Sequence, residues 1–330
     1  MAKAGVFVTR QIFPEALELI AREAELIVWP DDYPPSPEQL QREIAQVEGV
    51  LTTIMDRVDA AAMDAAPRLK VISQLAVGLD NIDVAEATRR GILVGHTPGV
   101  LAKATADLAF ALLMATARRI TESDHWVRAG NWKLAFHPMR WLGIDIHDAT
   151  LGIVGLGQIG LEMAKRGQGF GMKVLYCSRT RRPALEAEYG LEYAALPALL
   201  ASSDFVSLHV PLTPETRHYI GERELRMMKP TAILINASRG PVVDSQALYR
   251  ALKEGWIRAA GLDVTDPEPI PEDDPLLALD NVVITPHIGS ASEGSRRAMC
   301  LLAARNLMTG LRGKRLECCA NPELYRVKGI

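Results

Sequence analysis

The amino-acid sequence predicts an α/β protein with two doubly wound domains, and three observations carry this prediction. Short apolar runs alternate with helical stretches over the first hundred residues, and a second alternating series begins at Thr150. Such alternation is typical of parallel sheets whose strands are joined by crossover helices. A glycine-rich segment directly follows the first apolar run of the second series. A chain of 330 residues is also long enough for about two domains, each with its own core.

The first series contains five apolar segments that we expect to be strands. Helical stretches lie between them at Pro14–Glu23, Pro37–Val47 and Val84–Arg90. The long stretch Ala102–Ala129 follows this series and, being rich in Ala and Leu, is expected to form one or two helices. The expected strands are Gly5–Thr9, Glu25–Trp29, Gly49–Ile54, Leu69–Leu75 and Gly91–His96.

The second series supplies six further strands, and the last forty or so residues are expected to be largely helical. The Pro- and Asp-rich stretch Asp266–Pro275 is the most loop-like piece of this half, because these residues favour turns. The expected strands are Leu151–Gly155, Lys173–Ser178, Phe205–His209, Ala232–Asn236, Ala259–Val264 and Val282–Ile284.

The loop after the first strand of the second series has the pattern G-x-G-x-x-G. Between a strand and a helix, this pattern is the fingerprint of a dinucleotide site. The first glycine permits the tight turn, the second lets the backbone approach the pyrophosphate, and the third lets the helix pack close to the strand. The helix N-terminus then faces the phosphates. The expected cofactor contacts of this loop are Gly155, Leu156, Gly157, Gln158, Ile159 and Gly160.

Composition argues against several other classes of protein. Hydrophobic residues make up 48% and charged residues 23%, and the net charge of -3 comes without a long basic run, so no nucleic acid or anionic membrane partner is expected. No segment approaches the roughly 18 continuous apolar residues that a membrane span needs. The first residues are too short a stretch before the first expected strand to form a secretory signal. The four cysteines lack zinc-type spacing, no metal-binding cluster is evident, and a reduced cytoplasmic setting is the simplest expectation.

Three later segments, residues 235–244, 261–269 and 284–290, complete a pattern with the glycine loop. Together they closely resemble the D-isomer-specific 2-hydroxyacid dehydrogenase family, and the similarity runs from about Val6 to Asn306. Within that family the chain looks most like the glyoxylate/hydroxypyruvate reductase branch. The closer match is carried by residues 75–83, 130–132 and 176–180.

The resemblance implies a cofactor domain inserted within a substrate domain. The substrate domain would then comprise residues 1–98 plus 287–330, and the Rossmann domain residues 99–286. It also implies an active site in the cleft between two Rossmann-like or flavodoxin-like domains. The family usually dimerises through the cofactor domain, and Ala102–Ala117 offers an apolar face that one domain is not expected to cover, so we expect a homodimer.

Hydride transfer to a 2-oxo acid requires a proton donor and a group that holds the substrate carboxylate. Histidine suits the proton step because its ordinary pKa is near 6.5. A neighbouring carboxylate favours the imidazolium, and arginine can make paired hydrogen bonds with a carboxylate. The resemblance assigns these roles to His287 as general acid, Glu268 as its partner and Arg239 as the carboxylate ligand.

The resemblance also implies contacts outside this triad. Val77, Gly78 and Leu79 correspond to a loop whose backbone amides meet the substrate carboxylate, and Leu101 to an apolar substrate contact. Arg239 and His287 are expected to touch the cofactor as well as the substrate. The remaining expected cofactor contacts are Thr105, Ala237, Ser238, Asp263 and Gly289.

The residues after the second strand of the Rossmann domain partly indicate which cofactor is used. An NAD enzyme usually carries an acid there that binds the ribose 2′-hydroxyl. This chain has Ser178, Arg179, Thr180 and Arg181 instead. Arginines and hydroxyls would bind a 2′-phosphate, so NADP(H) is favoured and NAD(H) remains possible.

Two alternatives stay open at this point. One is another D-2-hydroxyacid dehydrogenase, acting on phosphoglycerate, lactate or an aromatic acid. Formate and phosphite dehydrogenases are disfavoured by Glu268 and Val77, where those branches carry glutamine and lysine. The other is a nicotinamide-sensing, corepressor-like binding protein that keeps a similar triad.

Overall fold

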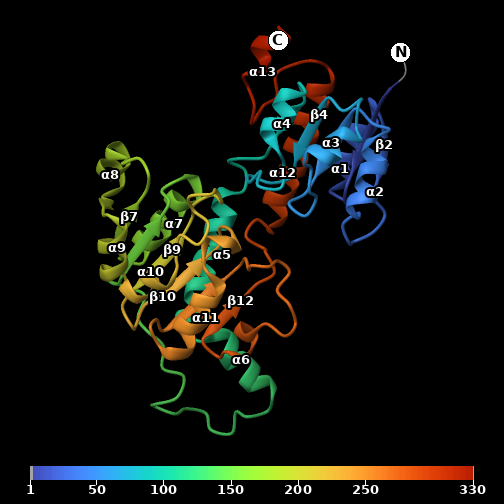
Figure 1. Ribbon diagram of the computed structural model, residues 1–330. Helices are drawn as coiled ribbons and strands as arrows, with labels where there is room; N and C mark the ends of the chain where they lie inside the picture. The colour runs from blue at the N-terminus through green and yellow to red at the C-terminus, as the bar shows by residue number, and fades with distance from the viewer. Residues whose placement is uncertain (1–2, 330) are drawn as a thin grey trace. The chain divides into compact units, whose positions relative to one another are not determined.

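The computed structural model describes residues 3–329 and divides into two compact units (Figure 1). Unit 1 comprises the chain up to Leu101 together with the segment that starts at Ser292. Unit 2 comprises Ala102–Ala291. The chain therefore changes unit at 101/102 and 291/292 instead of at the expected 98/99 and 286/287. His287 consequently lies in unit 2, together with Arg239 and Glu268.

Unit 1 is built on a five-stranded parallel sheet in the order β2-β1-β3-β4-β5. This is the flavodoxin-like order, in which the direction of winding reverses between β1 and β3. The carboxyl ends of those two strands therefore flank the crevice where such sheets bind ligands. The strands are β1 (Ala4–Val8), β2 (Ala24–Val28), β3 (Gly49–Thr52), β4 (Val71–Gln74) and β5 (Leu93–Gly95).

Helices cover both faces of this sheet. Helix α12 packs against β3, β4 and β5 and against α1, while α2, α3 and α4 share the core on the other face. Helix α2 begins at a capping box, in which Ser36 and Gln39 bond each other's backbone N–H groups. The helices are α1 (Pro14–Ala21), α2 (Pro37–Ile44), α3 (Ala60–Asp64), α4 (Val84–Arg89), α12 (Glu293–Leu311) and α13 (Leu324–Lys328).

Unit 2 is built on a seven-stranded parallel sheet in the order β12-β11-β10-β9-β6-β7-β8. Winding reverses between β6 and β9, as in dinucleotide-binding folds, so the carboxyl ends of these strands mark the expected cofactor site. The strands are β6 (Thr150–Val154), β7 (Lys173–Cys177), β8 (Glu192–Tyr193), β9 (Phe205–Leu208), β10 (Ile233–Asn236), β11 (Ala259–Leu262) and β12 (Val282–Ile284).

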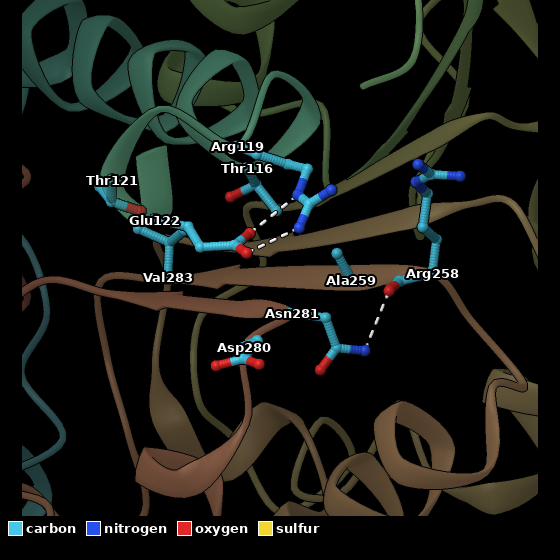
Figure 2. Close-up of a pocket in the computed structure, with 9 residues that line it drawn as sticks. All are labelled: Thr116, Arg119, Thr121, Glu122, Arg258, Ala259, Asp280, Asn281 and Val283. Atoms are coloured by element: carbon cyan, nitrogen blue, oxygen red, sulfur yellow. Dashed lines mark hydrogen bonds and ion pairs between the residues drawn. The ribbon is translucent and has the colours of Figure 1, made fainter. Parts of the chain in front are cut away.

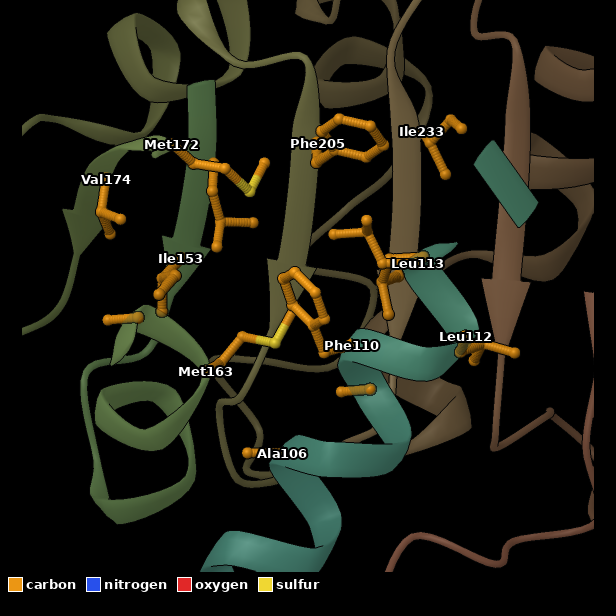
Figure 3. Packing of buried hydrophobic residues seen from close by; sticks show 14 of the residues in the cluster. Ala106, Phe110, Leu112, Leu113, Ile153, Met163, Met172, Val174, Phe205 and Ile233 are labelled. Carbon is orange, nitrogen blue, oxygen red and sulfur yellow. The ribbon is translucent and has the colours of Figure 1, made fainter. Parts of the chain in front are cut away.

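Helices α5 (Ala102–Ala117) and α7 (Gln158–Gly169) cover one face of this sheet. Figure 3 shows Phe110 and Leu113 of α5 packed against Phe205, Ile233 and other strand residues. The other face is covered by α9 (Leu196–Ser202), α10 (Glu222–Met227) and α11 (Ser245–Glu254). The expectation that one domain leaves the apolar face of Ala102–Ala117 uncovered is therefore wrong, because that face lies in the core of unit 2.

Exposed apolar side chains gather instead in α6 (Ile120–Arg128) and the loop after it. Trp132, Leu134, Phe136 and Met139 are 57–77% exposed. Aromatic contacts hold this segment. Trp126 packs edge-on against Trp141, the Arg119 guanidinium lies over the Trp141 ring, and the Arg140 guanidinium lies over the Trp126 ring. Figure 1 shows the loop leaving α6 without a strand or helix of its own.

The α/β class and the two doubly wound sheets are confirmed, and each expected strand is present with boundaries shifted by a few residues. The stretch Ala102–Ala129 forms two helices separated at Arg119, a non-glycine residue with a φ of 53°. The sequence analysis gave no bounds for helices α3, α8 (Pro183–Tyr189), α9, α10 and α11, for strand β8, or for the 3-10 turns η1 (Gly240–Val242) and η2 (Pro275–Ala278). Among the described residues, no helix combines the length and apolar character needed to cross a bilayer.

Candidate active site

Three neighbouring strands of unit 2 end beside one another and carry the predicted catalytic residues. Strand β10 pairs with β11, and β11 pairs with β12. Because all three are parallel, the segments that follow them start at the same edge of the sheet. Arg239 follows β10, Asp263 follows β11 and His287 follows β12. The sheet order thus brings together segments far apart in the sequence.

His287 and Glu268 are in direct contact. The His287 Nδ1 atom lies 2.5 Å from the Glu268 Oε1 atom, and both side chains are partly exposed, at 24% and 29%. Histidine donates from Nδ1 in this geometry, since an ionised carboxylate can only accept. Within residues 3–329, Nε2 has no protein partner. The ring is therefore oriented through one nitrogen and presents the other.

Asp263 holds the loop that carries His287. Its buried carboxylate accepts hydrogen bonds from the Thr285 hydroxyl at 2.6 Å, the Ile288 N–H at 2.9 Å and the Gly289 N–H at 2.7 Å. His287 itself adopts a left-handed backbone, with a φ of 52°. Such a conformation costs a non-glycine residue about 1 kcal/mol or more, and it persists when the surrounding bonds over-determine it. Asp263 supplies these bonds, and Thr105 of α5 lies beside Gly289 in the same cluster.

The turn that carries Arg239 is fixed by Asn236, the buried last residue of β10. The Asn236 side chain donates to the Arg239 carbonyl at 2.9 Å and accepts from the Ser238 N–H and hydroxyl. The next residue, Gly240, lies against the segment that leads to Glu268. A Cβ atom at Gly240 would overlap the carbonyl of Thr265, so a glycine is required where these two loops meet.

The glycine loop has the geometry that a dinucleotide site needs. Gly155 has a φ of +100°, and a Cβ there would lie 2.7 Å from the His209 carbonyl oxygen, so this turn also requires glycine. In contrast, a Cβ at Gly157 would meet nothing within 4 Å, which leaves room beside the N-terminus of the twelve-residue helix α7. Leu156 and Gly160 are buried, whereas Gln158 is exposed and Ile159 is partly buried. The residues present therefore fit a diphosphate group at this helix N-terminus.

The basic turn after β7 differs from the sequence expectation in one respect. Arg181 makes a two-point ion pair with Glu186, at 2.9 and 2.8 Å, and this pair together with the Tyr176 hydroxyl lowers the pKa of Glu186 to about 2. Ser178 donates its hydroxyl to the Thr180 carbonyl. Arg179 is exposed and makes no ion pair with any described residue. Arg179 is therefore better suited than Arg181 to bind a 2′-phosphate.

Val77, Gly78, Leu79 and Leu101 lie in unit 1. Within the described part of the chain, the N–H groups of Val77, Gly78 and Leu79 have no protein acceptor. The neighbouring carbonyls are occupied, since the Ala76 oxygen accepts from the Thr97 N–H and the Val77 oxygen contacts the His96 ring at 3.1 Å. N–H groups without a protein acceptor are available to donate to a bound anion. Leu101 is 7% exposed.

His209 lies at the crevice of unit 2, and no role was predicted for it from the sequence. It follows β9, its backbone lies against Gly155, and its Nε2 atom is 2.9 Å from the Ser207 hydroxyl. Its Nδ1 atom is buried without a partner among the described residues, and burial lowers the pKa of His209 to about 4.

A cavity of about 210 Å³ lies elsewhere in unit 2, at the amino ends of β11 and β12 (Figure 2). Its lining includes the ion pair of Arg119 with Glu122, as well as Arg258 and Asp280. This is the opposite edge of the sheet from His287, so the cavity is separate from the candidate active site. In the described residues, no three His, Cys, Asp or Glu side chains are grouped so that they could hold a metal ion.

Comparison with known proteins agrees with this geometry. Residues 110–289 match the family described as D-isomer specific 2-hydroxyacid dehydrogenase, NAD binding domain. A protein named glyoxylate reductase from Korarchaeum cryptofilum (strain OPF8) is 53% identical over 326 residues, which cover 99% of this chain and 98% of that protein.

Solved structures are similar over the same length. A crystal structure of a protein from Thermus thermophilus has a TM-score of 0.90 and 46% identity, covering 96% of this chain and 99% of that chain. An NADPH-dependent glyoxylate/hydroxypyruvate reductase from Sinorhizobium meliloti, in complex with NADP and malonate, has a TM-score of 0.86 and 32% identity, covering 97% of both chains. Unit 2 is accordingly an NAD-binding domain of the oxidoreductase type. The chain belongs to the D-isomer-specific 2-hydroxyacid dehydrogenase family.

Proposed function

We propose that this protein reduces glyoxylate to glycolate and hydroxypyruvate to D-glycerate, with NADPH as the preferred cofactor. The contact between His287 and Glu268 carries the proposal, because it gives the site an oriented proton donor. The full-length similarity to a protein named glyoxylate reductase supports the substrate class. The NADP-bound relative from Sinorhizobium meliloti supports the cofactor.

The nicotinamide, when bound, supplies the hydride that reaches the 2-oxo carbon. The protein's part is to deliver a proton to the carbonyl oxygen as that carbon is reduced. His287 donates this proton from Nε2 and becomes neutral, while Nδ1 stays bonded to Glu268. In the oxidation direction, the same nitrogen accepts the proton. Glu268 accepts the bond from Nδ1 throughout and so keeps the ring oriented.

Arg239 binds the substrate carboxylate and polarises the carbonyl. A guanidinium can make two parallel hydrogen bonds with a carboxylate, which fixes orientation as well as position. The unpartnered N–H groups of Val77, Gly78 and Leu79 supply further donors to the same carboxylate. Leu101 is an apolar substrate contact in this proposal.

The NADPH preference rests on the turn after β7. No acid occupies Ser178 or the three positions after it, so no carboxylate there repels a 2′-phosphate. Arg179 is the main phosphate ligand, and Ser178 and Thr180 add hydroxyl groups. Arg181 has a smaller part, because Glu186 already occupies its guanidinium at two points. NADH is a tolerated second cofactor. Thr105, Ala237, Ser238 and Gly289 would be further cofactor contacts, and Asp263 would lie near the nicotinamide end.

The proposal includes a homodimer formed through unit 2. The exposed apolar side chains of residues 120–142 supply the surface, in place of the α5 face that the core covers. Trp132 and Phe136 are 59% and 77% exposed, and such residues are enriched at stable interfaces. Light scattering at micromolar concentration tests this. A particle of 36.1 kDa would contradict the dimer.

A spectrophotometric panel tests the enzyme proposal. Glyoxylate, hydroxypyruvate, pyruvate and phenylpyruvate are each offered with NADPH and with NADH. We expect the highest kcat/KM with glyoxylate or hydroxypyruvate and NADPH. A preference for pyruvate or phenylpyruvate would favour another D-2-hydroxyacid dehydrogenase. Tight NADPH binding without turnover of any acid would favour a nicotinamide-sensing protein.

A further inference from the structure

The loop at residues 75–80 of unit 1 is closed by a bond between the two side chains that flank it. Gln74 is the last residue of β4, and Asn81 is the first residue after the loop. The Gln74 Nε2 atom donates to the Asn81 Oδ1 atom at 2.7 Å. The three N–H groups without protein acceptors, at Val77, Gly78 and Leu79, lie between these two residues. We call the Gln74–Asn81 pair the clasp.

The orientation of both amide groups follows from their other partners. Asn81 Nδ2 faces the backbone carbonyls of Thr53 and Asp56, at 3.0 and 2.7 Å, and a carbonyl can only accept. The Asn81 oxygen must therefore face Gln74, which presents its nitrogen. The Gln74 oxygen then accepts from the Thr52 hydroxyl at 2.7 Å. Every polar atom of the clasp side chains thus has a partner.

The clasp is attached to the crevice of the unit 1 sheet. Asp56 lies in the turn after β3 and accepts hydrogen bonds from the Thr53 N–H and hydroxyl, at 2.7 and 2.9 Å. The same carboxylate accepts from Thr9, directly after β1, at 2.5 Å. The ends of β1, β3 and β4 are therefore joined by buried and partly buried polar bonds, and the buried ones are strengthened by the low-dielectric interior.

We propose that Gln74 and Asn81 are positioning residues for substrate binding: the clasp holds the three N–H groups in the arrangement that accepts the substrate carboxylate. This inference rests on the proposed function, which assigns those N–H groups to the carboxylate. Donors contribute most when they are held in place before the ligand arrives, because their ordering then costs nothing on binding. Neither Gln74 nor Asn81 needs to touch the substrate.

Two variants break the clasp from opposite sides. Asn81→Ala removes all three hydrogen bonds of that side chain, and Gln74→Met keeps its length and removes its donor. Each is expected to raise the KM for glyoxylate and the inhibition constant of oxalate, an unreactive carboxylate, by about tenfold or more. The KM for NADPH and the kcat are expected to change less than threefold.

Asn321→Ala is the matched control. Asn321 is a buried asparagine of the same unit whose side chain makes four hydrogen bonds. It accepts from the Val94 N–H and the Cys319 thiol, and it donates to the Ile92 carbonyl and the Thr88 hydroxyl. Replacing it with alanine is expected to destabilise unit 1 at least as much as Asn81→Ala does, without touching the loop. Its KM for glyoxylate is expected to stay near that of the wild type.

The double variant Gln74→Met/Asn81→Ala decides between a clasp and two independent stabilising residues. If both substitutions act by breaking the same Gln74–Asn81 bond, the KM of the double variant is no higher than that of the single variant with the higher KM. The proposal would be overturned if the two increases in KM multiply in the double variant. It would also be overturned if neither single variant raises the KM more than Asn321→Ala does. If wild-type protein prefers another 2-oxo acid, the proposed function fails, and the same KM comparison with that acid still tests the clasp.

Discussion

The carboxyl edges of the two sheets offer binding groups in different ways. In unit 1, polar side chains at the edge bond one another, as Thr52, Gln74 and Asn81 do, and within the described residues the N–H groups of Val77, Gly78 and Leu79 have no protein acceptor. In unit 2, the edge presents side chains, because His287 keeps one ring nitrogen open while Glu268 holds the other. The difference suggests a division of labour, in which unit 1 supplies fixed donors for binding and unit 2 supplies groups that exchange protons.

The strongest test of this division is His287→Ala. Removing the proton donor is expected to lower the kcat for glyoxylate reduction by roughly 10²–10⁴-fold, with little change in KM. Steady-state kinetics at saturating NADPH measure it, and His125→Ala, an exposed histidine of α6, is the control. A fall in kcat of less than tenfold would show that His287 is not the proton donor, and the proposed difference between the two units would then fail.

Arg239→Lys asks whether unit 2 also contributes to substrate binding. Lysine keeps the charge but cannot make the paired hydrogen bonds. The transition-state stabilisation measured by kcat/KM for glyoxylate is therefore expected to fall by about 2–4 kcal/mol, with folding intact. Arg258→Lys, at the amino edge of the same sheet, is the control. Near-normal kinetics in folded protein would leave carboxylate binding to unit 1 alone.

His209, a partly buried polar residue at the same edge of unit 2, gives a stability prediction. Its pKa is about 4 in the folded protein, below the ordinary 6.5, because burial disfavours the charged ring. The unfolded chain therefore takes up the proton first, and unit 2 loses roughly 2 kcal/mol of stability as the pH falls from 6.5 to 4.5.

Urea unfolding at the two pH values measures this loss. Four of the five tryptophans lie in unit 2, so their fluorescence follows mainly that unit. His209→Gln should show a weaker dependence on pH between these values. An equal slope in wild type and variant would mean that other groups cause the acid sensitivity.

Arg179→Ala sharpens a comparison within unit 2. Arg179 makes no ion pair with any described residue, whereas Arg181 is ion-paired with Glu186. Loss of one charged hydrogen bond to a phosphate is expected to raise the KM for NADPH about tenfold and to leave NADH almost unchanged. Arg181→Ala should have a smaller effect, because Glu186 holds that guanidinium. Equal losses with both cofactors would leave the NADPH preference without support from Arg179.

Glu268→Gln tests whether Glu268 orients the proton donor of unit 2. Glutamine keeps the length of the side chain but can turn either a donor or an acceptor towards the His287 Nδ1 atom, so the ring is held less firmly and kcat is expected to fall roughly tenfold. Glu272→Gln, an exposed glutamate of the same loop, is the control. A kcat equal to that of the wild type would show that Glu268 does not act through His287.

Much of this architecture could be predicted from the sequence because buried parallel strands form continuous apolar runs. The strands before Gly155 and Asp263 are of this kind, and their ends marked the glycine loop and the catalytic segments. The contact between His287 and Glu268 was expected from the family pattern and is present. Helix α3 was missed because its five residues are too few to show a helical period.

Side-chain pairing was the part that the sequence could not reveal. Arg181 and Arg179 look alike in the sequence, but helix α8 brings Glu186 to one of them. Asn81 was visible as part of a family motif, yet its partners Thr53 and Asp56 lie on another loop. The apolar face of Ala102–Ala117 likewise gave no sign that its own unit would cover it.

The close approach at Gly240 sets a rule for redesigning substrate preference by directed evolution. Any side chain at this position would push apart the turn of Arg239 and the segment leading to Glu268. A library that randomises residues 239–241 would therefore consist mostly of inactive members, whatever substrate is selected. Diversity is better placed in the turn around Arg179, where the side chains are exposed and a substitution leaves the turn of Arg239 undisturbed.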